Sequence, residues 1–261
     1  MKKTLIALTL VACLLLSLCC VSTAEEAPVL LAYFTFDDAE NLGADASANG
    51  NNLVKAINPD GIKAVEGKFG GAVYFGGASG LLAQDDANND FVDTYAGKSI
   101  TVSFYAKVDI ENARTGNSRV VDEGINGSDL GFTMLVNTNK AEDGTASVFA
   151  IMKVGGSDWW SSASSAEGDP ADWHHYVMVY DSDACLVTTF VDDVKIAEVY
   201  ADEEEKISSD FTFCVGGNWA QWGWFNGGNF DVVCEGFTGS VDEVKVIGGA
   251  VYDMAAIEAL K

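Results

Sequence analysis

The sequence predicts an all-β protein built as an antiparallel sandwich or barrel. Short runs that alternate apolar and polar residues follow one another through most of the 261 residues, separated by turns rich in Gly, Asn, Asp and Ser. The chain has only 3 prolines, and helical periodicity is almost absent. No internal repeat and no linker-like run divides the sequence, so we expect one large β domain.

The clearest predicted strand is Ile100–Val108, in which every second residue is apolar and the residues between are mainly polar. The same pattern predicts further strands at Val29–Phe36, Ala72–Phe75, Phe132–Val136, Ser147–Val154, His175–Tyr180, Leu186–Val191, Phe211–Val215 and Gly239–Val246. Near the end, Asp253–Leu260 is predicted to be a short helix capped by Asp253.

The first residues predict export. Lys2 and Lys3 precede the apolar stretch Leu5–Cys20, and Ser22-Thr-Ala24 then supplies the small residues that a signal peptidase reads. The apolar stretch is too short for a comfortable membrane span. We therefore expect residues 1–24 to be a cleaved signal peptide.

The remaining residues, 25–261, are expected to form a domain secreted to the outside of the cell, with no transmembrane segment. Because Cys19 and Cys20 follow the apolar stretch, lipid attachment to the cell surface stays open as an alternative. The chain has 39 acidic and 15 basic residues and a formal net charge of −24. This excludes a nucleic-acid binder, which needs clustered Lys and Arg. The acidity is explained by solubility or by a requirement for a cation.

A series of segments from Val29 to the C-terminus occurs in a recognisable order. They are Ala32–Asp38 with the turn Asp45–Asn52, Gly67–Phe75, Ser99–Lys107, Asp172–Asp181, Thr189–Lys195, Phe237–Val246 and Met254–Leu260. In this order the chain resembles the LamG-like jelly-roll family of the concanavalin A-like lectin and glucanase superfamily. It departs from the family at Tyr105, where Trp is usual, and at Asp193, where a turn usually has Gly.

The resemblance implies that residues 25–261 form a two-sheet antiparallel jelly-roll sandwich. It also implies a kind of function, since members of the family are commonly glycan-binding or adhesive modules of secreted proteins. A fold of this kind does not by itself determine function.

No catalytic residues are predicted. His174 and His175 are the only histidines, and adjacent strand residues point to opposite faces, so they suit neither a metal site nor a shared catalytic role. The resemblance places them in a core strand beside Trp173. The serine-hydrolase pattern Gly-x-Ser-x-Gly is absent. So is the Glu-x-Asp-x-x-Glu spacing of the related glucanases, which would flank a sugar bond with carboxylates.

Four carboxylates form a candidate calcium site. Asp37 and Asp38 follow the first strand, and Asp242 and Glu243 lie in the last one, which this fold type can bring close together. Ca²⁺ prefers such oxygen ligands. The alternative is that all four are solvated residues that make turn hydrogen bonds.

Two cysteines bracket an unusual aromatic segment. A disulfide between Cys214 and Cys234 would close a loop of about 20 residues, worth roughly 3 kcal/mol in the chain-entropy model. The segment Gly216–Gly228 reads GGNWAQWGWFNGG and holds three tryptophans among glycines and amides. The candidate ligand-binding residues are Trp219, Trp222, Trp224, Asn218, Gln221, Asn226 and the pair Trp159-Trp160.

Sugar rings stack their apolar faces on aromatic rings, and amides bind their hydroxyls. The leading hypothesis is therefore a secreted, non-catalytic carbohydrate-binding module that uses this Trp-rich segment. Its ligand would be a glycan. One alternative is an adhesion or assembly protein that binds a cell-surface protein through the same residues. A weaker one is a glucanase-related enzyme. The tryptophans could also fold back as a small core of their own.

Overall fold

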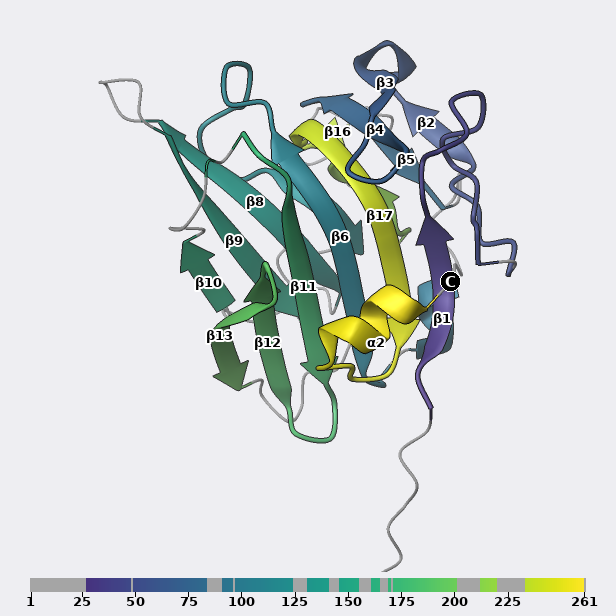
Figure 1. Ribbon diagram of the computed structural model, residues 1–261, viewed down its shortest axis with the longest axis vertical. Helices are drawn as coiled ribbons and strands as arrows, with labels where there is room; N and C mark the ends of the chain where they lie inside the picture. The colour runs from purple at the N-terminus through teal and green to yellow at the C-terminus, as the bar shows by residue number, and fades with distance from the viewer. Residues whose placement is uncertain are drawn as a thin grey trace, which may run out of the picture.

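The computed structural model is a sandwich of two large antiparallel β-sheets, which confirms the predicted fold class (Figure 1). It describes residues 27–47, 49–83, 91–95, 97–123, 131–140, 146–154, 161–164, 169, 171–200, 212–219 and 233–260. The predicted signal peptide, residues 1–24, lies outside them. No helix in this part of the chain is long and apolar enough to cross a membrane.

The eight-stranded sheet holds the strands at both ends of the domain. Its order is β13 (Val194–Tyr200), β12 (Leu186–Val191), β11 (His174–Asp181), β6 (Ile100–Val108), β17 (Thr238–Gly248), β4 (Gly71–Gly76) and β3 (Ile62–Glu66). In addition, β1 (Val29–Phe34) pairs with the second half of β17, beyond the residues that pair with β4. The last strand of the chain is therefore central to this sheet.

The seven-stranded sheet packs behind it. Its order is β10 (Ser161–Ser164), β9 (Ala146–Val154), β8 (Phe132–Lys140), β7 (Arg119–Glu123), β14 (Cys214–Val215), β5 (Gly80–Leu82) and β2 (Lys55–Ile57). The smaller elements are the hairpin β15 (Asn218–Trp219) and β16 (Val233–Cys234), the 3₁₀ turns η1 (Pro59–Gly61) and η2 (Phe91–Tyr95), and the helix α2 (Met254–Ala259).

Each predicted strand is present. The predicted bounds match for β6 and β12 and differ by a few residues elsewhere, the largest difference being β8, which ends at Lys140 rather than Val136. The first strand ends at Phe34 rather than Phe36, because Phe36 has a positive φ of 57° that a strand does not accommodate.

The main core lies between the two sheets and is rich in aromatic residues. Phe104 of β6 packs on Tyr176 of β11 with ring centroids 5.4 Å apart, and Phe132 of β8 lies 6.5 Å from Phe213. All four side chains are buried. Large rings of this kind contribute most of the buried apolar area of a sandwich core.

A second, smaller core lies on the outer face of the eight-stranded sheet, under α2 (Figure 1). Ile257 of α2 packs over Val177, Val179 and Ile247, which alternate with residues of the main core along their strands. The predicted helix cap is confirmed, since the Asp253 carboxylate accepts a hydrogen bond from the backbone of Ala255 at 3.0 Å.

The turn between β12 and β13 has a backbone conformation that Asp193 can adopt in place of the usual Gly. Asp192 and Asp193 have positive φ angles of 49° and 65°, a conformation that Asp tolerates better than most residues. The Asp192 carboxylate also accepts a hydrogen bond from the backbone of His175 at 2.9 Å and contacts His174 Nδ1 at 2.7 Å. The turn is therefore tied to β11.

Candidate ligand-binding site

The Trp-rich segment is carried by the hairpin β15–β16. Asn218 pairs with Cys234 and Trp219 pairs with Val233, so the two strands hold the ends of the connecting residues close together. The connection, residues 220–232, lies outside the described residues.

The base of this hairpin lies on the outer face of the seven-stranded sheet. Phe213 and Val215 point into the main core, so Cys214 between them points outward, as does its partner Leu82 in β5. Val233 of the hairpin packs on this outward pair, together with Ile57. The hairpin is therefore fixed to the sheet by a small apolar cluster.

Two glycines allow this close approach. A Cβ atom on Gly217 would lie 2.1 Å from Val233 Cγ1, and one on Gly80 would lie 3.1 Å from Cys214 Sγ. Larger residues at these positions would push the hairpin away from the sheet.

A buried polar network fixes the hairpin at two further points. The amide of Asn218 donates to Asp122 Oδ2 of β7 at 2.9 Å, and Arg119 Nη1 donates to Asp122 Oδ1 at 2.6 Å. Arg119 Nε also donates to Glu235 Oε2 at 2.8 Å, just after β16, and Asn117 donates to the other oxygen of Glu235 at 2.9 Å. Two residues of β7 thus hold the hairpin, Asp122 through Asn218 of β15 and Arg119 through Glu235 just after β16.

The charged groups of this network shift one another's pKa values toward the ionised forms. Burial alone would lower the pKa of Arg119, but the adjacent carboxylates of Asp122 and Glu235 raise it. Burial likewise favours the neutral form of Glu235, and the charge of Arg119 outweighs it, so the pKa of Glu235 is lowered. The side chain of Arg119 is only 13% exposed, and such a shielded ion pair is far less screened than a surface one.

The predicted ligand-binding residues are distributed as follows. Asn218 is 9% exposed and its amide nitrogen donates to Asp122, which positions the hairpin, and its contact with a ligand stays a prediction. Trp219 lies in β15. The others, Gln221, Trp222, Trp224, Asn226, Trp159 and Trp160, lie outside the described residues.

Arg119, Asp122 and Glu235 are absent from the sequence-based prediction of the site. They are far apart in the sequence and follow no known motif. One signal was available, because Arg119 is one of only two arginines in a chain rich in acids.

Known structures share this fold. No protein-family model and no curated protein matches the chain. Among solved structures, the chain is similar to domain 4 of the extracellular arabinanase AbnA from Geobacillus stearothermophilus, in complex with arabinotriose, with a TM-score of 0.54, 19% identity and coverage of 87% of this chain and 95% of that one.

Two further structures match at a similar level. The CBM40 domain of the Ruminococcus gnavus IT-sialidase, bound to α2,3-sialyllactose, gives a TM-score of 0.52 with 15% identity over 73% of this chain and 96% of that one. The binding domain of botulinum neurotoxin serotype D/C gives 0.58 with 12% identity over 88% of this chain and 51% of that one. At these identities the likeness shows the jelly-roll fold alone.

The candidate calcium ligands hold a turn between β3 and β4. Gly71 N donates to Asp37 Oδ1 at 2.7 Å, and Phe69 N donates to Asp242 Oδ2 at 2.9 Å. The two carboxylates therefore bind the backbone of the turn at two different residues. Gly70 is required there, since its φ is +77° and a Cβ would lie 2.2 Å from Asp37 Oδ1.

The other two candidates also have partners within the protein. Asp38 accepts a hydrogen bond from the backbone of Glu40 at 3.0 Å, and Glu243 accepts one from the hydroxyl of Tyr33. The first and last strands do lie side by side, as expected. However, the described residues contain no group of three or more His, Cys, Asp or Glu side chains that could hold a metal ion. The binding of Ca²⁺ by these four carboxylates stays a prediction.

The predicted disulfide is not formed. Cys214 is a free, buried thiol in β14, and burial raises its pKa well above the usual value, which makes it unreactive. Cys234 lies in β16, where it pairs with Asn218. The apolar cluster and the polar network hold the hairpin without a covalent link.

A Ser-His-Asp arrangement exists that the sequence pattern did not predict. Ser103 Oγ lies 2.8 Å from His175 Nε2, and His175 Nδ1 lies 3.4 Å from Asp193 Oδ1. Ser103 is only 2% exposed and His175 only 4%, since α2 lies over this face of the sheet. A nucleophile must reach its substrate, so this buried group stabilises the sheet and does not form an accessible active site.

Proposed function

We propose that the chain is a secreted, non-catalytic carbohydrate-binding module, a LamG-like jelly-roll domain whose Trp-rich hairpin contacts a glycan. The observation that carries the proposal is the anchored base of the hairpin. Asn218, Arg119 and Val233 attach it firmly to the seven-stranded sheet, and the connection between its strands contains Trp222 and Trp224. A rigid support that presents aromatic rings is what sugar stacking requires.

The similar structures support the same class of ligand. The titles of two of them name bound sugars, arabinotriose in one and sialyllactose in the other. The net charge of −24 favours a neutral glycan for this chain, since an acidic sugar would be repelled. We therefore propose a neutral oligosaccharide as the ligand.

The proposal is tested by glycan-array screening of residues 25–261, followed by titration of intrinsic tryptophan fluorescence. The double variant Trp222→Ala/Trp224→Ala should weaken binding about tenfold or more, as truncation of an aromatic hot spot does. Tyr200→Ala is the matched control, because Tyr200 is 78% exposed on the edge strand β13 of the other sheet.

Two results would overturn the proposal. One is that no neutral glycan binds. The other is that the double variant binds as well as the wild type. A stable protein complex in size-exclusion chromatography that the double variant abolishes would instead favour the adhesion alternative, with a cell-surface protein as partner.

A further inference from the structure

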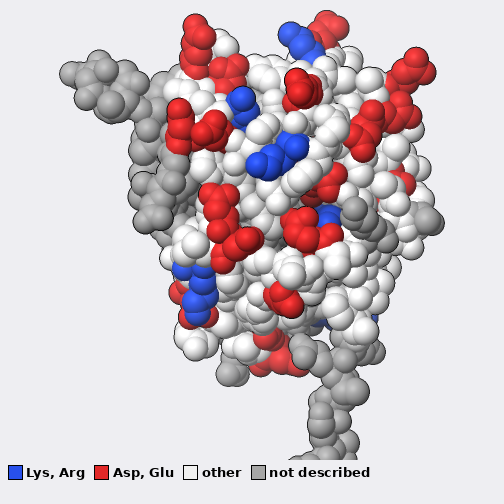
Figure 2. Space-filling view, in the orientation of Figure 1, with Lys and Arg blue, Asp and Glu red and all other residues white. Residues whose placement is uncertain are grey.

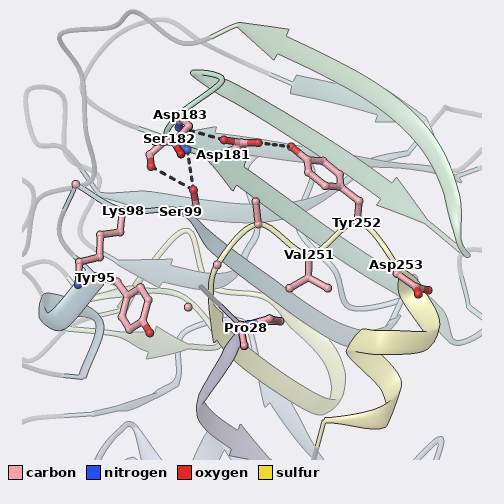
Figure 3. A pocket seen from close by; sticks show the side chains of 15 residues that line it. Pro28, Tyr95, Lys98, Ser99, Asp181, Ser182, Asp183, Val251, Tyr252 and Asp253 are labelled. Atoms are coloured by element: carbon pink, nitrogen blue, oxygen red, sulfur yellow. Dashed lines mark hydrogen bonds between the residues drawn. The ribbon is translucent and has the colours of Figure 1, made fainter. Parts of the chain in front are cut away.

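A pocket of about 760 Å³ lies at one end of the eight-stranded sheet, away from the Trp-rich hairpin. Four separate segments form its walls: residues 27–28 before β1, Tyr95 with residues 97–99 before β6, residues 181–183 at the end of β11, and residues 248–253 from the end of β17 to the start of α2 (Figure 3). This volume is within the usual range of small-molecule sites. No part of the proposed function uses it.

Hydrogen bonds join the lining segments and fix the shape of the pocket. Ser182 N donates to Ser99 Oγ at 3.0 Å, and the two serine hydroxyls lie 3.2 Å apart. Asp181 accepts hydrogen bonds from the backbone of Asp183 at 3.0 Å and from the hydroxyl of Tyr252 at 3.2 Å (Figure 3). The polar groups are therefore positioned before any ligand arrives, which lowers the entropic cost of binding.

Glycines and aromatic rings give the pocket its flat surfaces. A Cβ atom on Gly248 would lie 1.9 Å from the ring of Tyr95, so the ring rests directly on the backbone of β17. Tyr252 is 42% exposed at the other side of the pocket (Figure 3). A ligand with an apolar face can stack on such a ring.

The polar groups of the pocket select the kind of ligand. Asp181 and Asp183 supply carboxylate oxygens, Ser99 and Ser182 supply hydroxyls, and Lys98 is the one cationic side chain in the lining. Lys98 Nζ lies over the Tyr95 ring, 5.2 Å from its centroid, and is held near the wall. Acceptors thus outnumber donors, which excludes anions and suits a molecule rich in hydroxyl groups.

We propose that this pocket is a second binding site, for one or two units of a neutral saccharide. The sugar stacks an apolar face on Tyr252 and donates its hydroxyls to Asp183 and to the Ser99–Ser182 pair. The hairpin and the pocket belong to different sheets, so the module would bind two glycan chains at once and join them. Binding at the pocket does not depend on the hairpin, whereas the joining of two glycan chains rests on the proposed function of the hairpin.

The test is two-dimensional ¹⁵N NMR of residues 25–261, titrated with arabinotriose, xylotriose, cellotriose and maltotriose, and with glucosamine as a cationic probe. We expect at least one neutral trisaccharide to shift the amide signals of Ser99, Ser182, Gly248 and Gly249 in a saturable way. Tyr252→Ala and, separately, Asp183→Ala should weaken this binding about tenfold, the scale of losing one major contact.

Separate variants distinguish binding at the pocket from binding at the hairpin. In Trp222→Ala/Trp224→Ala the pocket signals should still shift, with unchanged affinity. Asp183→Ala alters an exposed turn residue, and so tests the pocket even if Tyr252→Ala fails to fold. The proposal is overturned if none of the neutral trisaccharides shifts the pocket signals, if only glucosamine does so, or if both pocket variants bind as tightly as the wild type.

Discussion

At the scale of single residues, Asp242 is in an unusual environment. Its side chain is fully buried, its Oδ1 atom has no hydrogen-bond partner among the described residues, and its Oδ2 atom accepts a hydrogen bond from the backbone N–H of Phe69. Burial, together with the nearby charge of Glu243, raises its pKa from 3.8 to about 7. The carboxyl is thus neutral in the folded protein over a range of pH in which it is charged in the unfolded chain.

This difference makes the stability depend on pH. The contribution of Asp242 is fully present below pH 4 and is lost as the pH rises through about 7, since the unfolded chain releases its proton first. Asp242→Asn keeps an acceptor for Phe69 and cannot ionise. We expect it to raise the free energy of unfolding by about 1–3 kcal/mol at pH 8 and to change it little at pH 4.

Urea denaturation at pH 4, 6 and 8 measures the effect. Other acids titrate equally in both proteins, so the difference between the two stability curves isolates Asp242. If the two curves stay parallel from pH 4 to pH 8, the raised pKa is wrong.

At the scale of elements, the sequence predicted those strands that bury one face completely. In β6 every second side chain enters the core, which leaves a clear alternation, and its bounds were predicted without error. The edge strand β13 buries none of its residues fully, and β7 buries Val120 and Val121 in succession, so neither shows a period of two. Both were missed for this reason.

The candidate site was predicted only in part, for a related reason. The segment around Trp219 stands out by composition alone, because tryptophans among glycines are rare. The supporting network joins Asn117 and Arg119 to Glu235, which lies 118 and 116 residues further along the chain, and only the pairing of the strands brings them together. No local pattern records such contacts.

The hairpin base offers a prediction at this scale. Asn218→Ala removes a donor from the buried carboxylate of Asp122, a loss that typically costs about 1–3 kcal/mol. We expect faster hydrogen exchange at the amides of Trp219 and Val233 and weaker glycan binding, with the rest of the protein unchanged. Asn112→Ala is the control, since Asn112 makes its hydrogen bond to Asp109 on the surface. Equal exchange in both variants would argue against the positioning role.

The helix α2 depends on one buried lysine. Lys245 of β17 is 2% exposed and donates to the carbonyls of Ile257 at 3.0 Å and Glu258 at 3.2 Å, at the end of the helix where a positive charge is favoured. Lys245→Met preserves the length of the side chain and removes both hydrogen bonds. We expect a loss of about 2–4 kcal/mol in the free energy of unfolding.

The matched control is Lys195→Met on β13. Lys195 is 52% exposed and pairs with Glu198 at 2.7 Å on the surface, so its loss should cost less than about 1 kcal/mol. Thermal and urea unfolding of the two variants compare them directly. A Lys245→Met protein as stable as Lys195→Met would show that the carbonyls of α2 do not need this lysine.

At the scale of the whole molecule, the acidic residues are widely distributed. Figure 2 shows Asp and Glu over much of the face that carries the eight-stranded sheet and α2, with few Lys or Arg between them. Charges spread in this way keep a protein soluble and apart from other acidic surfaces. The jelly-roll architecture, by contrast, was predicted from the order of the segments in the sequence. The similar structures keep the same fold at 12–19% identity.

The central place of β17 has a consequence for how the protein is made. The strand β17 is synthesised after all of its partners and must insert between β6 on one side and β4 and β1 on the other. Until it does so, two halves of the sheet that were synthesised much earlier have no partner between them. Contacts of such long range also fold slowly. The eight-stranded sheet is therefore completed only after β17 has been synthesised.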